Sequence, residues 1–364
     1  YDATHLGHAN TYLAFDLINR YLRATGAQVN FVENITDVDD PLLERAIRDG
    51  VDWKDLAHQQ IDLFRGDMEN LRVIPPAHYI GAVDAIPLVV DAISELSTLS
   101  TIYQVDSDQY FSVHADERFG SRSHLSEQEM VTIFSERGGD PDRSGKKNPL
   151  DCLVWMSQRP NEPGWDSTLG IGRPGWHIEC TAIALKYLDP SDLDPTLIDI
   201  QGGGSDLIFP HHEMCAAQAH VLTGKELAAS YVHTGMIGLD GEKMSKSKGN
   251  LVFVSRLVAA GTDPMAIRCA LMANHYRSDR MWSDSLLYEA EANWEQIKSA
   301  LVSDEVAPTE DVIVEIIKAL SDDLNTPKVL SLLAEWSSTT LSGAKGGSAS
   351  EFREVLDALL GLKF

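Results

Sequence analysis

The hydrophobic pattern at the start of the chain predicts a single helix. Residues 1–8 (YDATHLGH) lead directly into Phe15, Ile18 and Leu22, which recur at helical spacing and would share one face. Gly26 follows as a stop signal, because glycine readily adopts the left-handed conformation that ends helices. We therefore expect one amphipathic helix between residues 1–8 and Gly26.

Beyond this helix, extended and helical patterns alternate. Residues 28–33 (QVNFVE) predict a strand, residues 41–70 and 82–98 predict helices, and residues 197–200 predict an aliphatic strand that ends in a glycine turn at residues 202–204. Strands that alternate with helices favour a parallel sheet with right-handed crossovers, and ligands bind beyond the carboxyl ends of such strands. We expect an α/β fold with a Rossmann-like parallel sheet.

Changes in composition along the chain suggest four segments. Short strand-like pieces alternate with Gly-, Pro- and Asp-rich stretches between residues 101 and 175, as in an inserted subdomain, and a helical, acidic pattern begins at about residue 263. The predicted segments are the first half of the catalytic core at 1–100, without its N-terminal strand; an inserted connective subdomain at 101–175; the second half of the core at 176–262; and a C-terminal α-helical domain at 263–364. Residues 337–350 predict a flexible loop between the last helices.

Composition narrows the classes of partner. The chain has 364 residues, is 43% hydrophobic and carries a net charge of −25. A protein this acidic has few cations to spare for a large polyanion, so we expect small-molecule substrates and no nucleic acid. No apolar run of about 18 residues is present, which argues against a membrane partner. The four scattered cysteines indicate reduced thiols, and we expect a cytoplasmic monomer.

Two short motifs carry the chemistry that the sequence suggests. In HLGH, His5 and His8 could both face an anion at a helix N-terminus, and Gly7 would let a ligand approach the backbone. In KMSKS, Lys243 and Lys246 lie among donors in a loop suited to clamp a triphosphate and stabilise departing pyrophosphate. Taken singly, HLGH favours two surface histidines at a helix start, and KMSKS is equally compatible with an ordinary solvated basic loop.

Together, in this order, HLGH and KMSKS resemble the paired signature of the class I aminoacyl-tRNA synthetases. Four longer segments resemble the cysteine branch of that family, and they are NITDVDD at 34–40, PGWHIEC at 174–180, GGGSDLIFPHHE at 202–213 and DDLNTP at 322–327. The resemblance spans nearly the whole chain. It implies a Rossmann-like (HUP-type) parallel sheet as the nucleotide-binding core, and an enzyme that uses ATP, with Mg²⁺, to activate cysteine as an adenylate.

The resemblance also implies a zinc ion that holds the cysteine sulfur. Cys180 and His211 match two zinc ligands of the family, and a further cysteine is expected upstream of Tyr1. The cysteine branch has a glutamate where this chain has Cys215. One helical turn separates Cys215 from His211, so Cys215 either reaches the metal or is a small buried hydrophobe. His212 is expected to point elsewhere and support a neighbour.

Further site residues follow from the resemblance. The cysteine pocket would be lined by Thr4, Asn34, Ile35, Thr36 and Trp176. Adenine, ribose and the adenylate would be held by Thr11, Gly204, Ser205, Asp206 and Ile237. The catalytic group would be His5, His8, Lys243 and Lys246. For Trp176 and Ile237, plain core packing is the alternative. We expect His5, His8, Asp206 and Lys246 to surround one cleft.

Three departures separate the chain from the tRNA enzymes. ERGGDP at 136–141 resembles a signature of the mycothiol-pathway cysteine ligases, Cys215 replaces the glutamate, and the acidic helical domain has no anticodon-binding module after it. The whole chain therefore resembles those ligases, which attach cysteine to the amine of glucosaminyl-inositol. Two alternatives stay open, and they are a cysteinyl-tRNA synthetase and a non-catalytic paralogue that binds cysteine or nucleotide.

Overall fold

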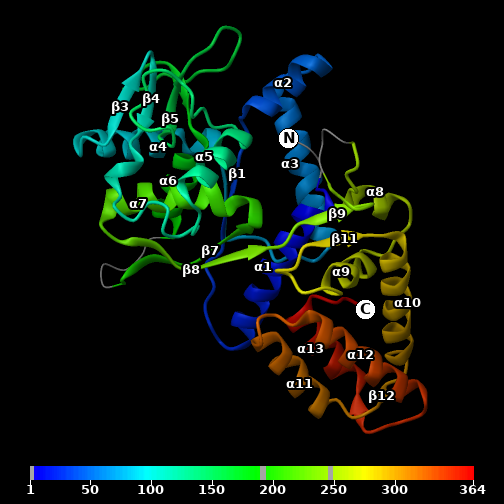
Figure 1. The fold of residues 1–364 in the computed structure, drawn as a ribbon. Coiled ribbons are helices and arrows are strands. Elements are labelled where there is room, and N and C mark those ends of the chain that lie inside the picture. The colour runs from blue at the N-terminus through cyan, green and yellow to red at the C-terminus, as the bar shows by residue number, and fades with distance from the viewer. Residues whose placement is uncertain (1–3, 189–193, 245–248) are drawn as a thin grey trace. The chain divides into compact units, whose positions relative to one another are not determined.

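The computed structural model describes residues 4–188, 194–244 and 249–364 (Figure 1). These residues form two compact units. The first, here called the insertion unit, comprises Asn30–His58 and Pro76–His233. The second, here called the HLGH unit, comprises the chain up to Val29 together with Gln59–Pro75 and Thr234–Phe364.

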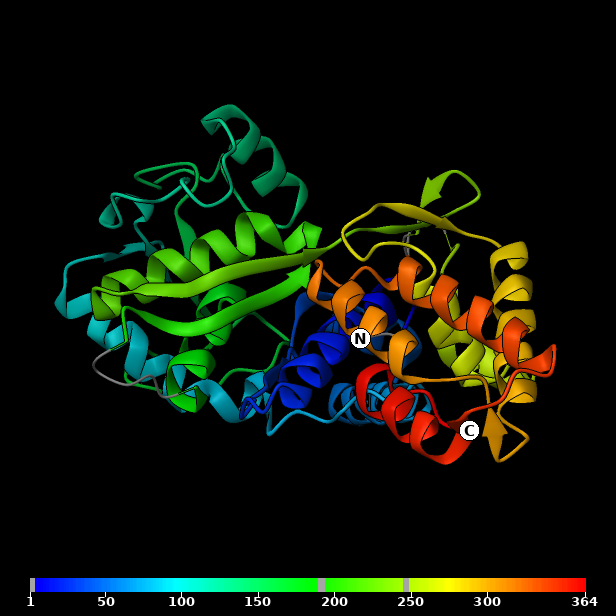
Figure 2. The ribbon, with the colours of Figure 1, turned by 90° about the horizontal axis from the view of Figure 1, so that it is seen from below.

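The insertion unit combines a parallel strand pair with an antiparallel sheet. Its strands are β1 (Val32–Ile35), β2 (His78–Gly81), β3 (Ile102–Val105), β4 (Asp108–Phe111), β5 (Cys152–Ser157), β6 (Gly172–Pro174), β7 (Thr196–Gly204) and β8 (Glu226–Thr234). Its helices are α2 (Asp40–Asp49), the start of α3 (Trp53–Asn70), α4 (Ala82–Thr98), α5 (Glu127–Glu136), α6 (Trp176–Tyr187) and α7 (Glu213–Thr223), with short helical turns η1 (Val113–Ala115), η2 (Ser205–Leu207) and η3 (Ile208–His212). β1 and β2 are parallel, β3 to β6 form an antiparallel sheet, and β7 pairs with β8 (Figure 2).

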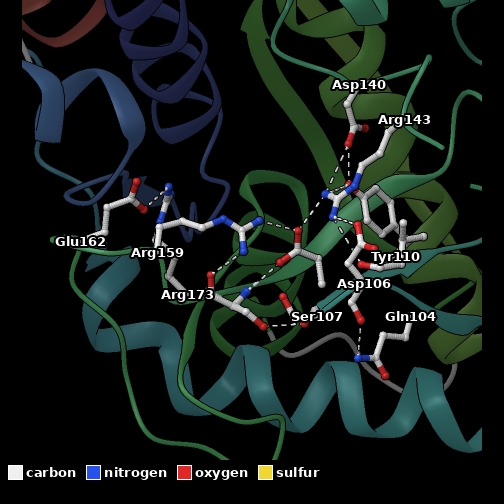
Figure 3. A network of polar contacts seen from close by, with 12 residues as sticks. Gln104, Asp106, Ser107, Tyr110, Asp140, Arg143, Arg159, Glu162 and Arg173 are labelled. Carbon is white, nitrogen blue, oxygen red and sulfur yellow. Dashed lines mark hydrogen bonds and ion pairs between the residues drawn. The ribbon is translucent and has the colours of Figure 1, made fainter. Parts of the chain in front are cut away.

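The core of the insertion unit lies between helices and the antiparallel sheet. Ile93 of α4, Trp155 of β5 and Ile178 of α6 are fully buried in one cluster. Most strands of the insertion unit are short. Ion pairs with buried carboxylates connect polar residues of neighbouring segments. Asp108 is fully buried and accepts hydrogen bonds from Arg143 at 2.7 Å and Arg159 at 2.6 Å. Figure 3 shows Arg143 and Arg159 within this network. Both guanidiniums and the backbone N–H of Ser157 hold the pKa of Asp108 below its usual value, against the effect of burial.

The ERGGDP segment ends helix α5 and joins this network. Gly138 has a positive φ of 86°, and the N–H of Gly139 donates to the carbonyl of Phe134 at 2.8 Å, which is a glycine-dependent helix ending. A side chain at Gly139 would lie 2.5 Å from the Phe134 ring. Asp140 binds Lys146 at 2.9 Å and accepts a hydrogen bond from the Tyr110 hydroxyl. The two glycines of the segment are therefore required by its geometry.

The HLGH unit is mainly helical (Figure 1). Besides most of α3, its helices are α1 (Leu6–Ala24), α8 (Val254–Ala259), α9 (Pro264–Met272), α10 (Asp284–Ala300), α11 (Glu310–Ser321), α12 (Thr326–Leu341) and α13 (Ala349–Leu360). Its strands are β9 (Ile237–Leu239), β10 (Glu242–Lys243), β11 (Arg280–Trp282), β12 (Glu305–Val306) and β13 (Gly347–Ser348). β9 pairs in parallel with β11 and in antiparallel with β10. Parallel pairing thus occurs in both units, in separate short sheets.

Helix α1 buries a different face from the one predicted. Phe15, Ile18 and Leu22 are only half-buried, whereas Asp16 and Arg20 are buried. Asp16 accepts hydrogen bonds from Arg20 at 2.8 Å and from the fully buried Arg268 of α9. Arg268 also donates to two backbone carbonyls, those of Leu71 and Leu360, each at 2.6 Å. The inner face of α1 therefore combines Leu6, Leu13 and Leu17 with this ion-paired network, which hydrophobic periodicity does not reveal.

Other boundaries also differ from the sequence predictions. The predicted loop at 337–350 is wrong in part, because Ser337–Leu341 continue α12 and Ala349 begins α13. The predicted turn at 202–204 is the end of β7. The helix at 82–98 is confirmed as α4. None of the helices within the described ranges is long and apolar enough to cross a membrane.

Candidate active site

In the HLGH unit, the histidines of HLGH lie at the N-terminus of α1. His5 is the N-cap residue, and its Nδ1 accepts a hydrogen bond from the N–H of Gly7 at 3.0 Å. The rings of His5 and His8 stack, with centroids 3.9 Å apart. A side chain at Gly7 would lie 2.8 Å from the His5 ring, so glycine is needed for this ring to fold onto the helix end. Both imidazoles therefore lie where a helix dipole favours an anion.

The segment before α1 is anchored by the segment before α8. The N–H of Val254 donates to the carbonyl of Thr4 at 3.0 Å, and the N–H of Leu6 donates to that of Val252 at 2.9 Å. Thr4 is fully buried. One turn into α1, the hydroxyl of Thr11 lies 2.7 Å from that of Thr234 and 3.3 Å from the carbonyl of Gly7. Thr4 and Thr11 thus lie on either side of HLGH in the chain and within the same unit.

The KMSKS motif begins at a hairpin of the HLGH unit. β9 contains Ile237, which is 2% exposed, and β10 ends at Lys243, whose backbone lies opposite Gly238. A side chain at Gly238 would meet the carbonyl of Glu242 at 2.5 Å, so the two strands require glycine there. Lys246 lies outside the described residues.

The residues predicted for cysteine and metal come together in the insertion unit. His211 at the end of η3 and Cys215 in α7 are both buried, and the Cys215 Sγ lies 3.8 Å from the His211 Nε2. Cys180 of α6 packs against the cluster that contains Cys215. Trp176 stacks on the ring of His211 with centroids 4.2 Å apart and is 40% exposed, so one face of this cluster is accessible.

Burial keeps this cluster uncharged. Burial lowers the pKa of His211 well below its usual value, with further lowering from neighbouring histidines, and lowers the pKa of His177 to about 3. Burial raises the pKa of the Cys180 thiol well above its usual value and that of Cys215 to about 12. The Nδ1 atoms of His177 and His211 lie 3.0 Å apart. A neutral imidazole has one ring nitrogen whose lone pair can accept a hydrogen bond or bind a metal ion.

The Cys215 thiol has a hydrogen-bond acceptor within the protein. Its Sγ donates to the carbonyl of His177 at 3.3 Å, as a buried thiol does. Within residues 4–188, 194–244 and 249–364, no three His, Cys, Asp or Glu side chains are grouped so that they could hold a metal ion. The ring nitrogens of His212 contact other neighbours, since its Nδ1 lies 2.8 Å from the Nε2 of His233 and its Nε2 lies 3.2 Å from the Gln201 amide nitrogen.

Strand β1 brings the NITDVDD segment to the same cluster. Asn34 and Ile35 are its last two residues, and Thr36 follows directly. The Asn34 side chain hydrogen-bonds the Cys180 thiol, which opposes the rise in the pKa of that thiol. The structure therefore joins Asn34, Cys180 and Cys215, with His211 and Trp176 beside them.

The glycine-rich segment ends β7 and turns sharply. Gly204 is the last residue of β7, and Ser205 and Asp206 form the first turn of η2. The Arg137 guanidinium of ERGGDP donates to the backbone carbonyls of Asp206 and Phe209. Sequence analysis assigned ERGGDP no structural role, and the structure places its arginine against the predicted nucleotide segment.

A second residue that sequence reasoning missed is Glu179, next to Cys180 in α6. It is 2% exposed, and its Oε2 has no hydrogen-bond partner in the described part of the chain. Burial raises its pKa well above the usual value, with smaller contributions from Asp37 and Asp39, and Arg173 opposes the rise. The sequence segment HIEC contains this residue, but burial of its carboxyl could not be inferred from spacing.

Comparisons with known proteins agree with the motifs. Residues 1–292 match the family described as tRNA synthetases class I (C) catalytic domain. A protein of Kribbella flavida named L-cysteine:1D-myo-inositol 2-amino-2-deoxy-alpha-D-glucopyranoside ligase is 54% identical over 365 residues, which cover all of this chain and 88% of the relative. Proteins of the same name from Thermomonospora curvata and Streptomyces coelicolor are 52% and 53% identical, again over all of this chain and over 87% and 88% of the relatives.

Solved structures support the fold. A Mycobacterium tuberculosis methionyl-tRNA synthetase in complex with methionyl-adenylate is similar with a TM-score of 0.66 and 17% identity, over 98% of this chain and 85% of that chain. A ternary complex of an Agrobacterium radiobacter LeuRS is similar with a TM-score of 0.67 and 12% identity, over 99% of this chain and 82% of that chain. The predicted α/β class I synthetase-like fold is therefore confirmed.

Proposed function

Since this chain belongs to the class I (C) tRNA synthetase catalytic-domain family, we propose that it activates L-cysteine with ATP and transfers it to an amino sugar. The acceptor is the amine of 1D-myo-inositol 2-amino-2-deoxy-alpha-D-glucopyranoside (GlcN-Ins), and the products are an amide, AMP and diphosphate. One observation carries this proposal, which is the identity of 51–54% over the whole chain to ligases that are named for these two substrates.

The cysteine pocket is assigned to the insertion unit. We propose that Cys180 and His211 bind zinc, together with the cysteine expected upstream, because thiol and imidazole donors are the ligands that zinc prefers. When bound, zinc would hold the substrate sulfur as a thiolate, for which a serine hydroxyl is a poor substitute. Trp176 and Thr36 would line the pocket, as the resemblance implies, with Asn34 and Ile35. The resemblance also assigns Thr4 to cysteine binding, and that residue belongs to the HLGH unit.

Adenylate formation is assigned to the two signature motifs and the β7 turn. The cysteine carboxylate oxygen attacks the α-phosphorus of ATP, and the bond to diphosphate breaks. His5 and His8 would stabilise the phosphate charge, and Lys243 and Lys246 the departing diphosphate. The nucleoside would be held by the remaining predicted residues, which are Thr11, Gly204, Ser205, Asp206 and Ile237. Mg²⁺ would accompany the triphosphate.

The transfer step needs no protein nucleophile. The neutral amine of GlcN-Ins attacks the cysteinyl carbonyl carbon, a C–N bond forms, the C–O bond to AMP breaks, and the amine loses a proton. Catalysis then consists of holding the two reactants in line. The four cysteines are all free thiols, which supports a reducing compartment, and we propose the cytoplasm.

The remaining alternative is a cysteinyl-tRNA synthetase. It would require a basic surface for tRNA, and the net charge of −25 argues against an extended one. The proposed function is tested by measuring cysteine-dependent AMP release with and without GlcN-Ins. GlcN-Ins should increase the rate of AMP release. A rate that is the same with and without GlcN-Ins would contradict the proposal.

The zinc assignment has its own test, which is metal content. Purified Cys180→Ala should lose about one zinc per chain, because one of few protein ligands is removed. The control is Cys269→Ala, a buried thiol of α9 that should keep its metal. Cys215→Ala separates the two open interpretations, since it should lose zinc only if Cys215 is a ligand. Unchanged zinc in Cys180→Ala would contradict the assignment.

A further inference from the structure

The DDLNTP segment at 322–327 forms the turn between α11 and α12, and its backbone is strained. Asp323 and Leu324 both have a positive φ, of 51° and 52°. Residues other than glycine adopt this left-handed conformation at a cost, and such strain concentrates at functional sites. The turn is held in place by Asn325, whose N–H donates to the carbonyl of Ala319 at 2.9 Å and whose side chain caps α12. Two strained residues in succession point to a role for this turn beyond the connection of two helices.

The turn places the Asp323 carboxylate against the segment that precedes β11. The carboxylate accepts hydrogen bonds from the Tyr276 hydroxyl at 2.7 Å and from two nitrogens of the Arg277 guanidinium, at 2.7 and 2.9 Å. Arg277 lowers the pKa of Asp323 from its usual value, partial burial opposes this, and Tyr276 adds to the lowering. Tyr276 itself is buried. An ionised carboxylate of the DDLNTP turn therefore anchors residues 276 and 277.

Residues 275–280 in turn hold the start of the hairpin that leads into KMSKS. The N–H of Gly235 donates to the carbonyl of Tyr276 at 2.7 Å. The N–H of Met236 donates to the Asp279 carboxylate, also at 2.7 Å. Strand β9 begins at the next residue and pairs in parallel with β11 (Figure 1). The position of the β9–β10 hairpin therefore depends on this segment.

The same segment also contacts the helix that carries HLGH. Arg280 is 9% exposed and donates to the side-chain oxygen of Asn10 in α1. The side-chain nitrogen of Asn10 donates to the carbonyl of Gly235 at 3.3 Å. Residues 275–280 thus connect α1 with the strand before KMSKS, which are the two elements that carry the predicted ATP-binding motifs.

We propose that Asp323 is a positioning residue for adenylate formation, which acts by holding residues 275–280 against α1 and the β9–β10 hairpin. The inference rests on the proposed function, since that function assigns both elements to ATP. Asp323 need not touch a reactant, because a displacement of about 1 Å in a catalytic group can cost on the order of 10²-fold in rate. The strain of the turn is then the cost of presenting this carboxylate to the segment.

The test is cysteine-dependent ATP–pyrophosphate exchange by Asp323→Ala, with kcat and both Michaelis constants measured. The ratio kcat/KM for ATP should fall about tenfold or more, because the ATP-binding elements lose their alignment. KM for cysteine should stay near the wild-type value, since most residues predicted for the cysteine pocket belong to the insertion unit. Asp322→Ala is the matched control, because Asp322 is an exposed neighbour in the same turn. It should behave as wild type.

Tyr276→Phe keeps the proposal falsifiable if Asp323→Ala fails to fold, because it removes only a hydroxyl. It should lower kcat/KM for ATP about threefold or more, as expected for the loss of one hydrogen bond to a charged group. In the Asp323→Ala background it should have little further effect, since the hydroxyl has already lost its acceptor.

Two outcomes would overturn the positioning role and leave the reaction intact. One is a wild-type kcat/KM for ATP in the folded variants. The other is an equal change in the KM values for ATP and cysteine, which would indicate a general structural defect. Wild-type protein that shows no cysteine-dependent exchange would overturn the proposed function itself.

Discussion

Histidines occur in pairs in both units, and the pairs differ in their surroundings. In the HLGH unit, His8 is exposed and stacks on the half-buried N-cap residue His5. In the insertion unit, His177 and His211 are buried, with their Nδ1 atoms 3.0 Å apart and their pKa values lowered by burial. The same residue type is thus placed for two chemistries, which are contact with a phosphate at a helix end and donation of a lone pair in a dry pocket.

Two kinds of buried polar group can also be compared. The histidines and thiols around Cys215 are neutral, whereas Asp16 of the HLGH unit lies ion-paired between Arg20 and Arg268. Asp108 of the insertion unit is a second buried, ion-paired carboxylate. A neutral cluster can change partners at low cost, while a buried charge that loses its partner is strongly destabilised. We therefore expect the neutral cluster to serve binding and the charged network to serve stability.

The largest expected effect tests that division. Arg268→Ala leaves the buried Asp16 with one of its two guanidiniums and should lower the free energy of unfolding by about 3–5 kcal/mol. Urea denaturation, monitored by tryptophan fluorescence, measures this free energy of unfolding. Arg48→Ala, which removes an exposed ion pair with Asp49, is the control and should leave the midpoint unchanged. Equal midpoints for Arg268→Ala and wild type would show that the network contributes no stability.

The next effect concerns the lysines that the HLGH unit is proposed to supply. Lys246→Ala should slow cysteine-dependent ATP–pyrophosphate exchange by a factor of about 10² to 10³, because a positioned cation acts mainly as diphosphate departs. Cysteine binding should change far less. Lys363→Ala, an exposed lysine near the end of the chain, is the control. Exchange within a few-fold of wild type would remove Lys246 from the catalytic group.

A smaller effect tests the contribution of the insertion. Arg137→Ala should raise KM for ATP about tenfold, because its guanidinium holds the backbone carbonyls of Asp206 and Phe209 in the predicted nucleotide segment. Arg137→Lys should rescue little, since an ammonium lacks the planar fork. Glu136→Gln is the neighbouring control. An unchanged KM for ATP in Arg137→Ala would show that Arg137 has a structural role only.

The sequence predicted some of this organisation because particular residues have few uses. HLGH was expected at a helix start and lies at the N-terminus of α1. The spacing of His211 and Cys215 predicted a shared helix face, and their side chains approach to 3.8 Å. The burial of Asp16 on α1 was not predictable, because Asp16 is paired with Arg268, which is 252 positions away. Glu179 was missed for a similar reason, since only the fold shows that its carboxyl is buried. Whether His5, His8, Asp206 and Lys246 surround one cleft stays a prediction.

The central claim concerns the acceptor, and a competition measures it directly. The intact protein is given ATP and radiolabelled cysteine with GlcN-Ins and cysteine-accepting tRNA in one vessel, at low and moderate salt. The account predicts that nearly all transferred label appears in Cys-GlcN-Ins, with little dependence on salt, because a small amino sugar makes no phosphate contacts. Label that accumulates on tRNA while GlcN-Ins remains unmodified would contradict it and establish the cysteinyl-tRNA synthetase alternative.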